Sequence, residues 1–265
     1  MSRHGVRPSR ALGQNFLADP NLAERIARLA GVGPHDEVIE VGPGLGSLTV
    51  ALAATGARVL ALEIDRRVLP ALAEVVEGLE VEVVSADALG FDWAGRLFGR
   101  RAVLVANLPY NVATPLVLEL LISVPEIVRM LVMVQKEVGE RIAARPGSRA
   151  YGAVSVRVAY FATVRLVARV PPAVFVPRPR VESVLVELTR RPKPAVAPEI
   201  ATFAEIDRVL GAAFATRRKM LRRSLREMVT EEDFSRAGID SSRRPEDLSL
   251  EEFGRLAHAL REAAA

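Results

Sequence analysis

The 265-residue sequence contains no cysteine, which excludes disulfides, thiolate nucleophiles and cysteine-ligated metals. Its three histidines, His4, His35 and His258, lie far apart along the chain, so we expect no metal site. No run of about 18 apolar residues occurs, and the basic amino terminus lacks the apolar stretch of a secretory signal. We therefore expect a cytoplasmic protein that does not contact membranes.

The formal net charge is only +4, but it is unevenly distributed. Basic residues outnumber acidic ones in 1–30 and 138–190, whereas acidic residues dominate 31–137. A run at 217–226, "RRKMLRRSLR", carries six positive charges and no negative one. A solvated helix face is the ordinary explanation, but like charges this close repel each other unless a polyanion relieves them. We expect about two and a half turns of one helix that contacts an RNA backbone through Arg217, Arg218, Lys219, Arg222, Arg223 and Arg226.

Short apolar runs alternate with helical patterns through the first half of the chain, which predicts a parallel, doubly wound α/β sheet. A helix should follow the Asp19 cap and stop at Gly31, and further helices are expected at 47–55, 66–77 and 114–122. The expected buried strands are 37–42, 58–65, 81–89, 102–108 and 129–135.

The second half of the sequence changes character twice. We expect 155–170 and 183–190 to be antiparallel strands that close one edge of the sheet. The proline-rich segment 191–199 has the composition of a linker. Beyond it only helical periodicity occurs, so we predict a domain at 1–190, with an amino-terminal arm at 1–18, and a small all-α domain at 200–265.

Glycines at 42, 44 and 46 stand between the first expected strand and its helix, where they allow the backbone to approach a ligand. The third glycine of a dinucleotide-binding pattern is replaced by Ser47. Glu63 ends the second strand and suits a ribose diol, and Asp87 follows the third and could accept from an adenine amino group, although both could instead cap helices. Since the loop has no Lys or Arg for a phosphate, the pattern favours S-adenosylmethionine over a nicotinamide cofactor.

Several motifs occur in order: "LGQNFL" (12–17), "EVGPGLGSLT" (40–49), "ALEID" (61–65), "DAL" (87–89), "NLPYN" (107–111), "FVPRPRVES" (175–183) and "FATRRKMLRRSL" (214–225). Together they span nearly the whole chain and closely resemble the bacterial small-subunit ribosomal RNA dimethyladenosine transferases. The resemblance implies a Rossmann-like class I methyltransferase domain with a mainly parallel sheet, plus a helical carboxy-terminal domain. It also implies dimethylation of two adjacent adenosines in the 3′-terminal hairpin loop of 16S ribosomal RNA.

The same resemblance assigns site residues. Cofactor contacts are expected from Asn15, Leu17, Gly42, Glu63, Asp87 and Asn107, with Gly44 added from the glycine loop itself. Phe175 would close one face of the target base. The arm would form a lid over the cofactor, with Arg3, Arg7 and Arg10 reaching RNA phosphates.

The hexapeptide "ANLPYN" at 106–111 carries the expected chemistry. Adenine's exocyclic nitrogen is a poor nucleophile, because its lone pair is delocalised into the ring. Two hydrogen-bond acceptors, the Asn107 side-chain oxygen and the Leu108 carbonyl, would draw that nitrogen toward tetrahedral geometry. Pro109 would fix the turn, and Tyr110 would stack on the base. A strand-ending turn with a core tyrosine is the alternative structural explanation.

The sequence is also compatible with two other functions. An Erm-type dimethylase would modify 23S ribosomal RNA, and an assembly factor would act mainly by binding the 30S precursor. The motif combination favours a monomeric enzyme of the small subunit that also contributes to its biogenesis.

Overall fold

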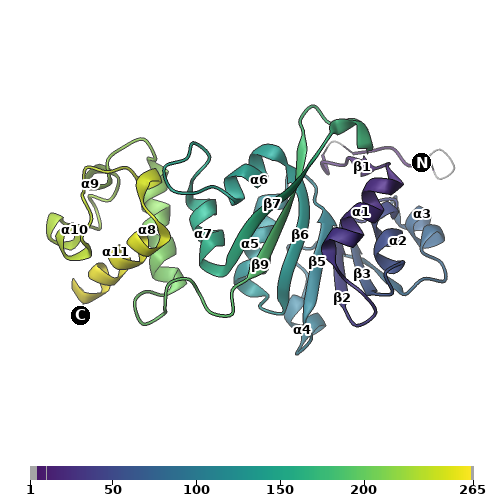
Figure 1. The fold of residues 1–265 in the computed structure, drawn as a ribbon, viewed down its shortest axis with the longest axis horizontal. Coiled ribbons are helices and arrows are strands. Elements are labelled where there is room, and N and C mark those ends of the chain that lie inside the picture. Colours follow the sequence, from purple (N-terminus) through teal and green to yellow (C-terminus); the bar gives the residue numbers. More distant parts are fainter. Residues whose placement is uncertain (1–4, 10, 264–265) are drawn as a thin grey trace. The chain divides into compact units, whose positions relative to one another are not determined.

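The computed structural model describes residues 5–9 and 11–263, and the chain forms two compact units (Figure 1). One unit comprises the described part of 1–139 together with 165–190. The other comprises 140–164 and the described part of 191–265. The predicted domain boundary at 190 differs from this division, which groups 140–164 with the carboxy-terminal residues.

The first unit is built on one seven-stranded sheet in the order β4-β3-β2-β5-β6-β9-β7. The pairs β2–β3, β2–β5, β3–β4 and β5–β6 are parallel, and β9 pairs antiparallel to β6. The predicted mixed, mainly parallel sheet is therefore confirmed. The strands are β2 (Glu37–Val41), β3 (Arg58–Glu63), β4 (Val81–Ser85), β5 (Ala102–Asn107), β6 (Ile127–Gln135), β7 (Ala162–Val170) and β9 (Ser183–Arg190).

Helix α1 (Pro20–Ala30) begins and ends as its sequence predicts. The Asp19 carboxylate accepts from the backbone N–H groups of Asn21 and Leu22, and Gly31 ends the helix in the left-handed conformation. Helices α1 and α2 pack against one face of the sheet, where their apolar residues meet the strands' valines and leucines (Figure 1). The remaining helices are α2 (Ser47–Ala53), α3 (Leu69–Val75), α4 (Trp93–Leu97), α5 (Ala113–Ser123) and α6 (Lys136–Ile142).

The amino-terminal arm is tied to the first unit by a small second sheet. Strand β1 (Phe16–Leu17) pairs antiparallel with β8 (Phe175–Val176), which follows a 3-10 turn, η2 (Pro172–Val174). Two residues near the start of the chain are thereby joined to a segment more than 150 residues later. This pairing fixes the position of Phe16 and Leu17.

The prediction of a continuous strand at 155–170 is wrong in its first half. Residues Ala153–Phe161 form helix α7, and only Ala162–Val170 form β7. Val156 and Tyr160, four residues apart, are both buried in the core of the second unit. The β-branched composition suggested a strand, but tertiary packing of the buried residues of α7 overrides that local preference.

The second unit is helical, as predicted for its carboxy-terminal part. Besides α7 it contains α8 (Phe203–Ala215), α9 (Leu221–Ser224), α10 (Glu231–Ala237), α11 (Leu250–Ala263) and the 3-10 turn η3 (Pro245–Asp247). Reciprocal side-chain caps begin α8 at Thr202 and α10 at Thr230. Phe234 and Phe253 are buried in its core. No helix within the described ranges is long and apolar enough to cross a bilayer.

The cationic run at 217–226 does not form the single helix that was expected. Helix α8 ends at Ala215, and α9 covers only Leu221–Ser224. The N–H groups of Leu221 and Arg222 donate to the carbonyls of Arg243 and Ser241, so the chain turns toward that loop. These contacts, and the repulsion between successive cations, oppose a continuous helix.

Candidate active site at the strand ends

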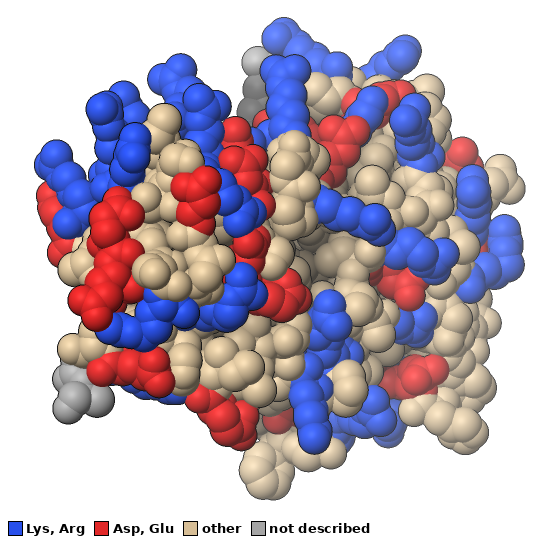
Figure 2. Space-filling view, turned by 60° about the vertical axis from the view of Figure 1, so that its left-hand side comes forward, with Lys and Arg blue, Asp and Glu red and all other residues tan. Residues whose placement is uncertain are grey.

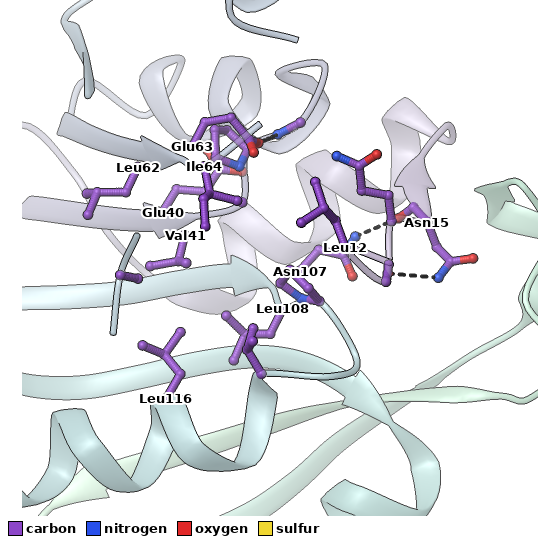
Figure 3. A pocket seen from close by; sticks show the side chains of 18 of the residues that line it. Leu12, Asn15, Glu40, Val41, Leu62, Glu63, Ile64, Asn107, Leu108 and Leu116 are labelled. Carbon is purple, nitrogen blue, oxygen red and sulfur yellow. Dashed lines mark hydrogen bonds between the residues drawn. The ribbon is translucent and has the colours of Figure 1, made fainter. Parts of the chain in front are cut away.

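A cavity lies at the carboxyl ends of four neighbouring parallel strands, β4, β3, β2 and β5 (Figure 3). The chain order reverses at β2, since β3 lies on one side of it and β5 on the other. Open α/β sheets bind ligands at such a point. The arm at 12–17, the glycine loop and the turn after β5 complete the lining.

The glycine loop after β2 needs its glycines. Gly42, Gly44 and Gly46 have φ values of +72°, +57° and +84°, which favour glycine over residues with a side chain. A Cβ on Gly44 would lie 2.7 Å from the Phe16 ring, so the arm can close over the loop only because this residue is glycine.

Glu63, at the end of β3, holds the glycine loop in place. Its Oε2 accepts from the Gly44 N–H at 3.0 Å, and its Oε1 accepts from the Asp65 N–H at 2.8 Å. Burial raises the pKa of Glu63, and these two bonds partly offset that effect. Each carboxylate oxygen retains a second lone pair, which can accept from a ligand hydroxyl.

Gln14, which the sequence reasoning missed, connects the arm to β3. Its Nε2 donates to Asp65 Oδ2 at 2.9 Å, and its Oε1 accepts from the Ser9 N–H at 2.7 Å. Two bonds from Arg67 lower the pKa of Asp65 to about 2, so this carboxyl stays ionised. The spacing between "GQNF" and "EID" gives no sign of this long-range contact.

Asn107, at the end of β5, binds the arm through its amide nitrogen. Its Nδ2 donates to the Asn15 carbonyl at 3.0 Å (Figure 3). This contact leaves Oδ1 as the acceptor at a position that lines the cavity. Asn111, also missed, donates to the Ala11 carbonyl at 3.4 Å, so the hexapeptide and the arm are joined at both ends.

The turn after Asn107 presents one further acceptor. The Pro109 carbonyl already accepts from the N–H groups of Val112 and Ala113, where α5 begins. No backbone N–H of the described residues donates to the Leu108 carbonyl. Tyr110 lines the cavity, and its hydroxyl bonds to Ser183 Oγ at 2.9 Å. Burial raises the pKa of Tyr110, so it remains a neutral phenol.

Four further residues were expected to contact the cofactor, the target base or RNA, and they lie in different environments. Leu17 and Asp87 line the cavity, and Asp87 is exposed, with Oδ1 accepting from the Leu89 N–H. Phe175 is 2% exposed, packs in the core beside Leu17 and does not line the cavity. Stacking on a base would require its ring to leave that core. Arg7 is exposed.

The expected RNA-contacting cations are not equivalent. Arg3 and Arg10 lie outside the described residues. Arg217 pairs with Glu246, with Nε 2.6 Å from Oε2, and also donates to the Arg149 carbonyl at 2.8 Å. It therefore has a structural role in the second unit. Figure 2 shows Lys and Arg side chains projecting over much of the face in view. The exposed members of the run are Arg218, Lys219, Arg222, Arg223 and Arg226.

The cavity is chemically suited to an adenosine that carries a positive charge. The charged residues among its described lining are Glu40, Glu63 and Asp87, all acidic. A phosphate group would find no Lys or Arg there, whereas a sulfonium cation is compatible with carboxylates. Glu63 would hold the ribose, Asp87 would accept from the adenine amino group, and the glycine loop would allow close approach. S-adenosylmethionine supplies an electrophilic methyl group when it is bound.

Comparisons with known proteins agree with this geometry. A family model described as ribosomal RNA adenine dimethylase matches residues 6–262. A protein named ribosomal RNA small subunit methyltransferase A from Pelotomaculum thermopropionicum is 45% identical, over 99% of this chain and 95% of its own length. One of the same name from Enterococcus faecalis is 41% identical, over 98% and 92%.

Two solved structures share the fold. A dimethyladenosine transferase from Plasmodium falciparum has a TM-score of 0.75 at 26% identity, covering 91% of this chain and 95% of that one. The 23S rRNA methyltransferase ErmE has a TM-score of 0.72 at 26% identity, covering 93% and 100%.

The sheet, the glycine loop and the acidic cavity define a Rossmann-like methyltransferase that uses S-adenosylmethionine. With the family model matching almost its entire length, the chain belongs to the ribosomal RNA adenine dimethylase family. It is therefore an enzyme that dimethylates adenine in ribosomal RNA.

Proposed function

We propose that the protein dimethylates the exocyclic amines of two adjacent adenosines in the 3′-terminal hairpin loop of 16S ribosomal RNA, and thereby contributes to small-subunit biogenesis. Relatives named for the small subunit are 41–46% identical to it, whereas the 23S enzyme ErmE is 26% identical. This difference in identity supports the small-subunit acceptor.

One observation carries the proposed chemistry: Asn107 uses its Nδ2 to bind the Asn15 carbonyl. In this orientation Asn107 Oδ1 accepts one N–H of the adenine amine, and the Leu108 carbonyl accepts the other. Tyr110 stacks on the ring, and its bond to Ser183 limits its rotation. These residues position the amine and exclude water, and no strong general base is required.

RNA contact outside the cavity is proposed for the exposed cations of 217–226 and for Arg7. Lys219, Arg223 and Arg226 line a separate groove of the second unit, in which Glu227 pairs with Arg226. Cations along such a groove suit phosphodiesters, and they position RNA without reading its sequence. We include Arg3 and Arg10 because they are close to Arg7 in the sequence.

The test is methylation of purified 30S particles and of 23S RNA in parallel, with mass spectrometry of the nucleosides. We expect N6,N6-dimethyladenosine in 16S RNA and none in 23S RNA. The reverse distribution would identify an Erm-type enzyme. Asn107→Ala protein in cells lacking the native gene separates catalysis from assembly: normal 30S maturation without methylation would show that binding is the main contribution.

We also propose that the enzyme is a cytoplasmic monomer, because its substrate is ribosomal and because this chain alone supplies the core of each unit. Light scattering of the purified protein would test the monomer. A mass of twice 28.7 kDa would contradict it.

A further inference from the structure

Glu40 is a buried acid in the cavity to which the proposed chemistry assigns no role. It lies near the end of β2, just before the glycine loop, and it is 1% exposed (Figure 3). Glu40 and Glu63 both line the cavity. The strand pattern places Glu40 on the same face as Val38, which packs into the core, so alternation along β2 could have predicted its burial.

No Lys or Arg among the described residues that line the cavity offsets a negative charge on Glu40. Glu63, from β3, repels that charge, and the uncharged Thr49 hydroxyl, from α2, stabilises it only in part. Among the described residues, Glu40 Oε2 and Thr49 Oγ1 both lack a hydrogen-bond partner of good geometry. Arg66 and Arg67 follow Glu63 closely in sequence, but neither lines the cavity, and Arg67 pairs with Asp65.

Glu37, three residues earlier on the same strand, is the natural comparison. It is also buried, at 7% exposure, but Arg100 lies 3.2 Å from its Oε2. A cation beside a buried carboxylate offsets part of the cost of burying its charge, and Glu40 has no such cation among the described residues that line the cavity. Burial raises the pKa of Glu40 to about 8, although the Thr49 hydroxyl partly opposes this shift and Glu63 adds to it.

We infer that Glu40 exchanges a proton with solvent according to the charge of the ligand in the cavity. Glu40 is a neutral acid when the cavity is empty, and it is a carboxylate when a ligand with a sulfonium cation occupies the cavity. Once the sulfonium has become a neutral thioether, Glu40 takes a proton back from solvent. The inference rests on S-adenosylmethionine as donor and does not depend on which RNA is methylated.

This exchange gives Glu40 a role in selecting donor over product. An ionised Glu40 favours the cationic donor, and a neutral Glu40 removes that preference after transfer. Because proton release and binding are linked, the donor's affinity should rise with pH up to about 8 more steeply than the product's. Product inhibition should therefore be strongest at low pH.

Titration calorimetry of the full chain tests the inference without measuring activity. S-adenosylmethionine and S-adenosylhomocysteine are each titrated at pH 7.5 in phosphate and in Tris, whose ionisation enthalpies differ. At this pH about three-quarters of Glu40 should be protonated in the free protein. We expect the donor to release up to about three-quarters of a proton more than the product does.

Two variants assign the proton to its residue. Glu40→Gln should abolish the difference between donor and product while both still bind, and Glu37→Gln should retain it. Titration of the ligands' own groups cancels in the comparison of variants. Equal proton release by both ligands in the wild type, or an unchanged difference in Glu40→Gln, would overturn the inference.

A measurement on the wild type alone guards against a variant that fails to fold. Infrared spectroscopy should detect the carbonyl stretch of a protonated carboxyl in the free protein, and donor addition should remove it. Persistence of that band at saturating donor would also contradict the inference. Absence of any binding heat would instead challenge the cofactor assignment, so the two failures are distinguishable.

Discussion

The cavity of the first unit and the cationic run of the second are opposites in charge and in burial. Glu40 and Glu63 are buried, and no Lys or Arg occurs among the described residues that line their cavity. Arg218, Lys219 and Arg223 are exposed, and no described carboxylate forms an ion pair with them. Burial makes an individual charge selective for a small ligand, whereas exposure leaves charges free to bind a long polyanion.

The comparison also separates residues that act on ligands from those that support the fold. Within the cationic run, Arg217 is held by Glu246 and the Arg149 carbonyl. Around the cavity, Asp65 is held by Arg67 and Gln14. Residue type alone does not show which charged side chains are already paired within the protein and which are free to bind a ligand. The following variants test this division.

The largest effect is expected for Asn107→Ala, which removes both an acceptor for the amine and the bond to the Asn15 carbonyl. We expect methyl transfer to fall by about 10²–10³-fold, as for loss of one preorganised polar group. Asn111→Ala is the matched control, since Asn111 also bonds to the arm, at Ala11, and should cost less than about threefold. Single-turnover methylation of 30S particles measures both, and equal losses would assign Asn107 to arm binding alone.

Phe175→Ala should show whether the Phe175 ring stays in the core during turnover or stacks on the target base. Because the ring is 2% exposed in the core, we expect a loss of about 3–5 kcal/mol in unfolding free energy. Chemical denaturation gives this value. A variant of unchanged stability whose methyl transfer is impaired would instead support the predicted stack on the target base.

Tyr110→Ala should reduce methyl transfer by about 10–100-fold with cofactor affinity nearly intact, as expected for loss of a stacking contact of about 1–3 kcal/mol. Tyr110→Phe keeps the ring and removes only the bond to Ser183, so its loss should be small. Turnover and calorimetric cofactor binding would be compared. Equal turnover of all three proteins would refute stacking.

Substitution of the exposed cations should change salt dependence more than stability. Each of Arg218→Ala, Lys219→Ala and Arg223→Ala should reduce the slope of log affinity against log salt by roughly one. Arg217→Ala should leave that slope nearly unchanged and lower the melting temperature, because it breaks the Glu246 pair. Filter binding over a salt series and thermal melts would distinguish Arg217→Ala from the other three variants. Identical slopes in all four variants would contradict the distinction between Arg217 and the exposed cations.

The last comparison concerns pH and the ligand-free protein. Since the folded pKa of Glu40 is raised to about 8 from 4.5, its contribution to stability is complete below pH 4.5 and is lost as pH rises toward 8. Glu40→Gln should therefore melt near the wild type at pH 5 and above it at pH 8. A difference between the two proteins that does not vary with pH would indicate that Glu40 is ionised throughout.

Local pattern predicted the elements of the sheet well, because buried strands and capped helices leave short-range signals. Asp19, Gly31 and the glycine loop are such cases. It failed at 153–161, where valines typical of strands form α7, and at 217–226, where the loop at 241–243 diverts the backbone. The roles of Gln14 and Phe175 depend on contacts 51 and about 158 residues away in sequence, which periodicity cannot reveal.

The pairing of β1 with β8 has a consequence for the order in which the protein is made. Phe16 and Leu17 leave the ribosome early, but their partners at 175–176 follow only after most of the sheet has been synthesised. Until then the arm lacks the strand that fixes it, and the Asn15 carbonyl is not yet held in place for Asn107. The nascent chain therefore acquires a complete cofactor site late, when residues 16–17 pair with residues 175–176.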